Sequence, residues 1–184
     1  LVNDLITLSK LETDNGMESQ GPVNISALLA SIRNEAQAFS GDHQHLIELD
    51  CQANVTLRGN EKELHSAFSN LVFNAVKYTP DGGEIRLGFT VDERGPQFFV
   101  NDNGIGIDPQ HLPRLTERFY RVDASRNSAT GGTGLGLAIV KHVLARHDAE
   151  LAIESKPRQG SRFSCRFPAA RLLDEQPSLP AAAT

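Results

Sequence analysis

Four short motifs, each rich in glycine or in polar side chains, follow one another along a chain of 184 residues. They cover residues 70–78 (NLVFNAVKY), 102–107 (DNGIGI), 117–121 (ERFYR) and 131–137 (GGTGLGL). The stretches between them change repeatedly between helical and strand periodicity, so the motifs lie along or between the elements of a mixed α/β fold. Amides, a carboxylate, arginines and a glycine-rich loop are the parts that a nucleotide site needs. The order therefore predicts one site that all four motifs build together.

Three long helices are expected in the same part of the chain. Asn24 is a good N-cap for the first helix and Asn60 for the second, which ends at Tyr78. A third helix opens at Gly134 and ends near His147. The first helix is expected to turn five apolar side chains inward: Ile25, Leu28, Leu29, Ile32 and Phe39.

Strands are expected between these helices. The segments with strand patterns are residues 46–49, 55–58, 84–91, 97–101, 151–155 and 162–167. A short helix should follow Pro109, and residues 123–132, rich in Ser, Asn, Ala and Gly, should form a mobile loop. The pattern predicts one sheet covered by helices, a two-layer α/β sandwich.

The chain opens at Leu1 in mid-pattern, which is what a fragment of a longer protein would show. Leu1, Leu5, Leu8 and Leu11 fall within one arc of a helix. A helix this short is marginal in water by itself, so we expect a longer helix that continues upstream and has a helical partner. The alternative is an ordinary N-terminal helix that packs on its own domain.

These patterns divide the chain into four parts. Residues 1–14 would be the end of the longer helix, 15–22 a linker, 23–170 the globular domain and 171–184 a flexible tail rich in Pro and Ala.

The composition excludes several classes of protein. A net charge of −5 and a pI near 5.7 argue against a nucleic-acid-binding surface, which needs clustered positive charge. Cys51 and Cys165 are far apart and lack metal-ligand spacing, so we expect two free thiols in a reducing compartment. The sequence shows no signal peptide and no apolar run of about 18 residues that could span a membrane.

The second helix carries a polar stripe. Asn70, Asn74, Lys77 and Tyr78 are spaced i, i+4, i+7 and i+8, so their side chains share one face, while the opposite arc is apolar. The carbonyl oxygen of Asn74 can bind Mg²⁺, a hard cation that prefers oxygen ligands. Lys77 can reach a phosphate and Tyr78 can lie against a purine or ribose. A solvated helix face is the alternative for this motif taken alone.

Asp102 follows an apolar strand and precedes a glycine turn. A carboxylate accepts a hydrogen bond from the exocyclic amine of adenine, whereas guanine presents an oxygen there. Two buried acceptors face to face cost about 1–3 kcal/mol, so this position selects ATP over GTP. Gly104 and Gly106 are expected to let the backbone approach the base. A plain Asp-Asn-Gly turn is the alternative.

The last motif is expected to hold phosphate. Residues 132–137 run directly into an apolar helix, so free backbone N–H groups and the helix dipole point at whatever precedes it. The glycine spacing is not that of a dinucleotide-binding fingerprint, and a P-loop would need Gly-Lys-Ser/Thr. Arg118, Arg121 and Arg126 precede the glycines and can close over a terminal phosphate.

The order and the amino-acid sequences of these motifs resemble those of the N, G1, F and G2 boxes of bacterial sensor histidine kinases. These kinases belong to the Bergerat-fold superfamily, which also includes gyrase, Hsp90 and MutL. Residues 160–163 (GSRF) match the family's G3 position, and residues 1–12 look like the end of the second helix of its dimerisation and phosphoacceptor domain. The likeness covers nearly all of the chain up to about Ala170.

Within the family, residues 113–123 (PRLTERFYRVD) and 131–142 look most like the phosphate-regulon sensor kinases. Thr116 departs from the Phe of many members, and residues 147–149 (HDA) replace a common HGG. Neither difference touches the expected ATP site.

The resemblance implies a Bergerat fold, ATP and Mg²⁺ as cofactors, and a set of site residues. Asn70, Lys77 and Arg121 would be catalytic, and Asn74 would hold the magnesium ion. The residues expected to bind ATP are Asn74, Lys77, Tyr78, Asp102, Gly104, Gly106, Ile107, Arg118, Tyr120, Arg121, Gly132, Thr133, Gly134, Leu135, Gly136, Leu137 and Ser161. Ser161 would help to place Asp102 or a water molecule bound to it.

The resemblance also implies partners and a location. The γ-phosphate of ATP would pass to a histidine on the protein's own dimerisation domain and then to an aspartate of a PhoB-like response regulator, in phosphate-starvation signalling. The full-length protein would be a homodimer in the inner membrane. This chain would be a soluble, cytoplasmic part of it and could be a monomer by itself. The phosphoacceptor setting His-Glu-(aromatic or Leu)-Arg/Lys-Thr-Pro does not occur around any of the six histidines. His142 and His147 are expected to pack or to cap a helix.

Asn70 separates two kinds of relative. Members that hydrolyse ATP are expected to carry Glu at this position, where a carboxylate can take a proton from water; an amide cannot serve as a general base near pH 7. This favours a kinase over a hydrolytic ATPase or a serine kinase of the anti-sigma type. A nucleotide-sensing module without catalysis remains a further alternative.

Overall fold

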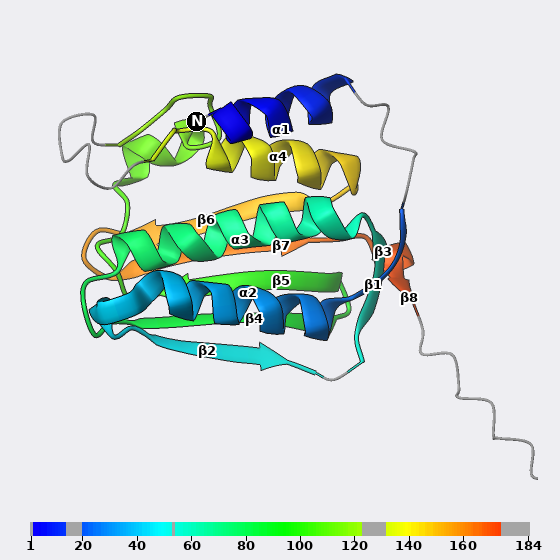
Figure 1. Ribbon diagram of the computed structural model, residues 1–184, viewed down its shortest axis with the longest axis horizontal. Coiled ribbons are helices and arrows are strands. Elements are labelled where there is room, and N and C mark those ends of the chain that lie inside the picture. Colours follow the sequence, from blue (N-terminus) through cyan, green and yellow to red (C-terminus); the bar gives the residue numbers. More distant parts are fainter. Residues whose placement is uncertain (1, 14–19, 53, 123–131, 174–184) are drawn as a thin grey trace, which may run out of the picture.

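The computed structural model describes residues 2–13, 20–52, 54–122 and 132–173. A five-stranded sheet forms one layer, with its strands in the order β2 (Leu46–Cys51), β4 (Glu84–Asp92), β5 (Gly95–Asp102), β7 (Gly160–Arg166) and β6 (Glu150–Lys156). β2 runs parallel to β4, and the other neighbours are antiparallel. The helices α2 (Ile25–Ser40), α3 (Glu61–Tyr78) and α4 (Gly136–Arg146) cover one face of this sheet (Figure 1). The predicted two-layer α/β sandwich is confirmed.

A small second sheet closes the opposite end of the molecule from the motifs. It contains β1 (Gly21–Asn24), β3 (Thr56–Gly59) and β8 (Leu172–Leu173), in the order β1-β3-β8. The expectation of one sheet was therefore wrong. β1 leads into α2 and β3 leads into α3, so the two neighbouring helices bring their leading segments together, and these pair with each other.

This small sheet includes residues that the sequence analysis assigned to the linker and to the tail. Gly21 and Pro22 pair with Gly59 and Arg58. Leu172 pairs with Leu57, which is fully buried. The small sheet thus includes residues on both sides of the expected domain, because its short edge strands are held by tertiary pairing and not by a local pattern.

Both expected N-caps are present. The Asn24 side chain accepts a hydrogen bond from the Ala27 N–H at 3.0 Å, and the Asn60 side chain accepts one from the Glu63 N–H at 3.1 Å. Each bond satisfies a backbone donor that the first turn of a helix otherwise leaves without a partner. Helix α3 therefore begins at the residue that the sequence indicates, and this fixes the rotation of its polar stripe.

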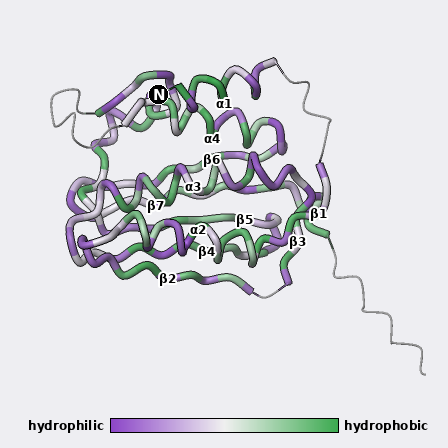
Figure 2. The backbone as a smooth tube through the Cα atoms, viewed as in Figure 1, coloured by the Kyte–Doolittle hydropathy of each residue, from purple (hydrophilic) through white to green (hydrophobic). Residues whose placement is uncertain are grey.

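The core lies between the sheet and the helices. Phe68 of α3 stacks on Phe98 of β5, with ring centroids 4.1 Å apart, and meets Phe167 edge-on. In Figure 2 the hydrophobic segment of β5 runs under the helices. Phe39, expected inside, is 52% exposed and lies against Phe73 on the helical surface. The last turn of α2 instead buries Ser40, whose hydroxyl bonds the ring of His45, and this leaves Phe39 at the rim.

The N-terminal helix α1 (Val2–Thr13) lies on α4 (Figure 1). Leu8 is buried and joins the core, and Leu11 packs against it. Leu5 and Ile6 are exposed, so only part of the apolar arc meets the domain. Leu1 and residues 123–131 of the mobile loop expected at 123–132 lie outside the described residues. In the part of the chain that the structure describes, no helix has the length and hydrophobicity needed to cross a bilayer.

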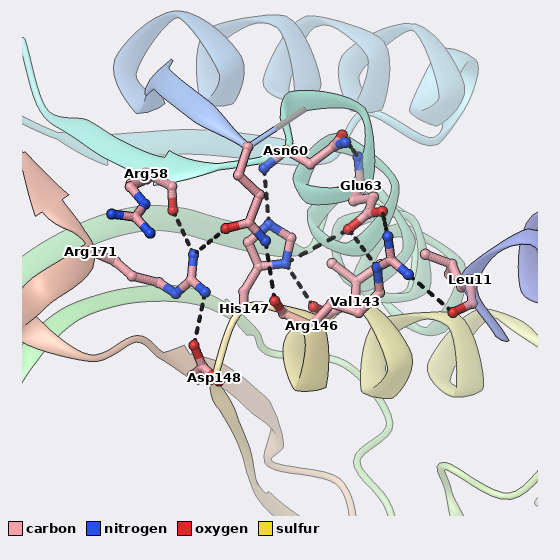
Figure 3. A network of polar contacts seen from close by, with 10 residues as sticks. Leu11, Arg58, Asn60, Glu63, Val143, Arg146, His147, Asp148 and Arg171 are labelled. Carbon is pink, nitrogen blue, oxygen red and sulfur yellow. Dashed lines mark hydrogen bonds and ion pairs between the residues drawn. The ribbon is translucent and has the colours of Figure 1, made fainter. Parts of the chain in front are cut away.

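A polar junction joins the start of α3 to the end of α4 (Figure 3). The ring of His147 is fully buried; its Nδ1 donates to the Val143 carbonyl at 2.8 Å and its Nε2 accepts the Asn60 N–H at 3.0 Å. Arg146 bonds Glu63 of α3 and the backbone carbonyl of Leu11 in α1. His147 is thus buried and bonds the last turn of α4, as expected for a residue that packs or caps a helix.

Candidate nucleotide site

The four motifs meet at one end of the molecule, on the left in Figure 1. The C-terminal end of α3, the end of β5 and the start of α4 all lie there. The 3₁₀ helix η2 (Pro109–Arg114) and the segment that follows it lie at the same end. The described residues of the four motifs thus lie together at one end of the fold.

The polar face of α3 begins at the contact with α4. The Asn70 Nδ2 donates to the Ser66 carbonyl at 2.8 Å, and this leaves the side-chain oxygen free to face α4. A Cβ added to Gly136 would lie 2.7 Å from that oxygen, so the glycine permits the approach. Asn70 is therefore an orienting contact between the two helices, and its acceptor atom lies at the N-terminal end of α4.

Lys77 and Arg121 converge on the glycine-rich loop. A Cβ at Gly132 would lie 3.5 Å from the Lys77 Nζ and 4.0 Å from the Arg121 Nε. Burial lowers the pKa of Lys77 and the neighbouring Arg121 lowers it further, while Asp4 raises it. Two cations held close together in this way can attract a polyanion.

Asn74 and Tyr78 lie along the same face of α3. Asn74 is half-buried, and it makes no side-chain hydrogen bond with any residue that the structure describes, so its carbonyl oxygen is available to a ligand. The Tyr78 side chain is 52% exposed and can present its ring to a base or a sugar.

Asp102 lies at the end of β5, opposite Ser161 of β7 in the sheet register. The Gly104 N–H donates to its Oδ1 at 2.9 Å. Burial raises the pKa of this carboxyl group, while hydrogen bonds from the backbone N–H groups of Gly104 and Ser161 lower it. Asp102 is thus a half-buried acceptor whose orientation is set by its backbone neighbours.

The two glycines after Asp102 are required by the protein's own backbone. A Cβ at Gly104 would overlap the carbonyl oxygen of Tyr78, and one at Gly106 would overlap that of Lys156. Gly106 also has a φ of +68°, which disfavours other residues. Beside the expected close approach to the base, the structure gives a second reason for these glycines, their close approach to α3 and to the β6–β7 hairpin.

The segment before the glycine-rich loop is held by contacts that sequence reasoning missed. The Tyr120 hydroxyl bonds the Nδ1 of His111 at 2.6 Å, and the guanidinium of Arg114 lies 4.3 Å from the centre of the Tyr120 ring. The Phe119 N–H donates to the Gly134 carbonyl at 2.9 Å. Tyr120, expected to bind ATP, is therefore placed against η2, and Phe119 anchors the segment to the loop.

Helix α1 brings two carboxylates to residues that were expected to bind ATP. The Thr133 hydroxyl donates to Asp4 at 2.9 Å, and Arg118 forms an ion pair with Glu12. Glu12 also lies 3.6 Å from the Nε2 of His142. No local sequence signal pointed to these contacts, because both carboxylates lie outside the apolar arc of the helix.

The remaining residues of the loop have mixed roles. Leu135 is fully buried, so only its backbone can face a ligand, and the half-buried Leu137 packs against the core. Gly134 has a φ of +72° and packs on the backbone of Phe119. The Ile107 N–H donates to Ser155, so it supports the turn after Asp102. Arg126 lies outside the described residues.

Comparison with known proteins agrees with this geometry. The model of the family described as "Histidine kinase-, DNA gyrase B-, and HSP90-like ATPase" matches residues 59–171. The chain belongs to this family of Bergerat-fold ATP-binding domains, and its predicted likeness to bacterial sensor histidine kinases is confirmed.

Curated relatives are sensor proteins. The chain is 59% identical over 180 residues to the phosphate regulon sensor protein PhoR of Pseudomonas aeruginosa. The aligned region covers 98% of this chain and 41% of the relative. It is 45% identical over 161 residues to PhoR of Haemophilus influenzae, covering 88% of this chain and 37% of the relative. The chain thus spans about two fifths of the length of these relatives.

Solved structures show the same fold. The structure of full-length ShkA in complex with AMPPNP superposes on this chain with a TM-score of 0.81 and 27% sequence identity. The match covers 98% of this chain and 37% of that one. The mycobacterial sensor histidine kinase MprB has a TM-score of 0.71 and 25% identity, over 82% of this chain and 97% of that one.

Proposed function

We propose that the chain is the ATP-binding catalytic domain of a sensor histidine kinase. The observation that carries this proposal is the placement of three groups at one end of the fold: the acceptor Asp102, the cations Lys77 and Arg121, and the glycine-rich loop at Gly132. Together they match the base and the phosphates of one nucleotide. The binding of AMPPNP by a structural relative supports the same ligand class.

Asp102 would read the base. Its Oδ1 is oriented by the Gly104 N–H, and the remaining lone pairs of the carboxylate can accept the exocyclic amine of adenine. Guanine would place an oxygen against the carboxylate, at a cost of about 1–3 kcal/mol for the unpaired acceptors. Tyr78, which is exposed at the end of α3, would lie against the purine or ribose.

Lys77, Arg121 and the backbone N–H groups of residues 132–137 would bind the phosphates. Arg118 would join them once it is released from Glu12. Asn74 would hold Mg²⁺, because it offers a neutral oxygen without a protein partner among the described residues. When bound, this ion would neutralise part of the phosphate charge; Lys77 and Arg121 would stabilise the negative charge of the transferred phosphoryl group.

The amide of Asn70 favours transfer over hydrolysis. It occupies the position next to α4 where a carboxylate could activate water, and an amide has no basic site near pH 7. The phosphoryl group would instead go to a histidine on the dimerisation domain of the whole protein. A ring nitrogen attacks the γ-phosphorus, the bond to the bridging oxygen breaks, and ADP leaves.

The signalling context is proposed from the relatives. The similarity to the PhoR proteins favours a role in the response to phosphate starvation, with relay of the phosphoryl group to an aspartate of a PhoB-like response regulator. In this scheme α1 is the end of the second helix of the dimerisation domain, the whole protein is a homodimer, and the chain is the cytoplasmic portion of an inner-membrane sensor.

A calorimetric titration with Mg-ATP, followed by Mg-GTP, tests the proposal. We expect binding of ATP, weak or no binding of GTP, and no continuing heat after saturation. Addition of a separate dimerisation domain that contains the acceptor histidine should then consume ATP, and Arg121→Ala should slow this transfer while it leaves binding in place. Sustained heat from ATP alone would identify a hydrolase, and binding without any transfer would identify a sensing module.

A further inference from the structure

Ser155, near the end of β6, is outside every motif of the nucleotide site but touches two of them. It lies opposite Ser161 in the register of β6 and β7, and it is half-buried. Ser161 in turn lies opposite Asp102 of β5. The three side chains therefore form one row across neighbouring strands, which ends at the expected adenine-reading carboxylate.

Three polar groups surround the Ser155 hydroxyl. Its Oγ accepts the Ile107 N–H at 2.8 Å, donates to the Gly160 carbonyl at 3.0 Å, and lies 2.8 Å from the Oγ of Ser161. A hydroxyl has one proton to donate and two lone pairs that accept, so all three contacts can form together when Ser161 is the donor to Ser155. This arrangement leaves the lone pairs of Ser161 for a ligand or a water molecule.

The Ile107 contact fixes the far end of the turn that follows Asp102. The near end is fixed by the bond from the Gly104 N–H to Asp102 and by the bond from the Ile105 N–H to the Tyr78 carbonyl at 3.0 Å. Ser155 thus supplies the side-chain anchor of the turn on the β6 side.

The β6–β7 hairpin fits closely against the same turn. The Arg158 N–H donates to the Ile105 carbonyl at 2.7 Å, and Gly106 packs on the backbone of Lys156. Gly160, with a φ of +94°, packs on the backbone of Asp102. Both strands of the hairpin therefore contact the turn. Because the Ser155 hydroxyl lies at this contact, a small shift of the hairpin there would move both Asp102 and Ser161.

We propose that Ser155 is a positioning residue for adenine recognition. It acts through two others: it orients the Ser161 hydroxyl and it holds the Ile107 end of the turn, so that Asp102 and Ser161 face the base edge together. This inference rests on the proposed function, because it assumes that the row from Ser155 to Asp102 reads a base. Ser155 itself touches no part of the nucleotide.

The test compares Ser155→Ala with Ser155→Thr and with Ser164→Ala. Ser155→Thr keeps the hydroxyl in a strand that tolerates threonine. Ser164→Ala removes a buried hydroxyl from β7, opposite Phe99 and away from the turn, and is the matched control. Dissociation constants for ATP, ADP and GTP are measured by calorimetry, and the unfolding temperature of each variant is measured without ligand.

We expect Ser155→Ala to lower the affinities for ATP and for ADP by the same factor, about fivefold to tenfold. This is the effect expected when one or two hydrogen bonds that order the base-binding end of the site are lost. Affinity for GTP should change little, so the preference for ATP falls. Ser155→Thr should recover most of the affinity, and Ser164→Ala should bind ATP as the parent chain does. Parental affinity in Ser155→Ala, or an equal loss in Ser164→Ala, would overturn the proposal.

A measurement without ligand separates this inference from the proposed function. Hydrogen exchange at the Ile107 amide should become faster in Ser155→Ala and return toward the parental rate in Ser155→Thr. If the parent chain binds no ATP, the proposed function fails, and the exchange rate still shows whether Ser155 holds the turn. If ATP binds and the exchange rate at Ile107 does not change, the positioning role is wrong while the proposed function stands.

Discussion

At the scale of single residues, the candidate site depends on side chains whose orientation is set by backbone groups. Asp102 is held by the N–H groups of Gly104 and Ser161, and Asn70 by the carbonyl of Ser66. Such bonds fix the orientation of each side chain and leave its remaining lone pairs in a defined direction, so the direction in which a ligand must approach is set before it binds. This preorganisation reduces the cost of ordering these groups on binding.

Asp102→Ala removes the proposed base contact without disturbing the core. We expect ATP affinity to fall by about tenfold to a hundredfold, the range for loss of a hydrogen bond to a charged group, while the unfolding temperature changes little. Calorimetry and a thermal melt on the same sample measure both. Asp92→Ala, at the other end of the β4–β5 hairpin, is the control. Undiminished affinity in Asp102→Ala would remove this residue from the site.

At the scale of elements, the contact between α1 and the glycine-rich loop stands out. Asp4 accepts a hydrogen bond from Thr133 and raises the pKa of Lys77, so its negative charge lies among the groups proposed to bind phosphate. Glu12 pairs with Arg118 at the other end of the same helix. A docked α1 therefore offers carboxylates to the same donors that we propose to bind the nucleotide.

Asp4→Asn should consequently bind Mg-ATP more tightly than the parent chain, by about threefold to tenfold, because the phosphates no longer compete with a carboxylate. The gain should shrink at high salt, which screens the charge. Calorimetry at two salt concentrations measures both effects. Glu48→Gln, an exposed neutralisation on the edge strand β2, should not change affinity. Weaker binding in Asp4→Asn would mean that the carboxylate supports the site.

The polar junction between α3 and α4 predicts a dependence of stability on pH. Burial lowers the pKa of His147, whose Nε2 accepts the Asn60 N–H and cannot do so once protonated. Below about pH 6.5, the ordinary pKa of histidine, the unfolded chain binds a proton that the folded chain does not. The free energy of unfolding should therefore fall with decreasing pH, by at most about 1.4 kcal/mol per pH unit from this residue.

Urea unfolding of the parent chain and of His147→Gln between pH 7.5 and 5.5 measures this effect. The variant should be less stable at neutral pH but should lose less stability on acidification. His43→Gln, at an exposed ring paired with Asp81, is the comparison. Equal pH slopes for the parent chain and His147→Gln would show that other groups cause the dependence.

At the scale of the whole molecule, one aromatic cluster ties the helical layer to the sheet. Phe68 stacks on Phe98 of β5 and meets Phe167, the residue that follows β7, so a single side chain of α3 contacts two separate segments of the chain. The same helix carries the polar stripe on its other side. Burial of Phe68 therefore fixes how Asn70, Asn74 and Lys77 face the end of the sheet.

Phe68→Ala should lower the free energy of unfolding by about 3–5 kcal/mol, because the substitution leaves a cavity and removes the contacts with Phe98 and Phe167. Phe39→Ala, which truncates a ring that is 52% exposed, should cost much less. Chemical denaturation of both variants gives the two values. A similar loss in each would show that the rim pair of Phe39 and Phe73 is as important as the core.

Local sequence patterns determined most of the secondary structure of this protein and the residue types of its candidate site. The caps at Asn24 and Asn60, the polar stripe of α3 and the expected strands of the main sheet follow from residue types and spacing over a few positions. The four motifs and their order led to the family, because each motif keeps its chemistry in a short stretch of chain. Convergence of Lys77 and Arg121 on Gly132 could also be expected from these motifs.

Other features were decided only by the tertiary structure. Asp4 and Thr133 are 129 residues apart, and neither has a local signal for the other. Gly104 is required by the packing of the turn on the end of α3, and Gly106 and the hydroxyl of Ser155 acquire their roles when the β6–β7 hairpin packs on the same turn. The small sheet forms because two helices bring their leading strands together. Secondary structure depends on near neighbours in sequence, whereas these contacts depend on which distant surfaces the core brings within hydrogen-bonding distance.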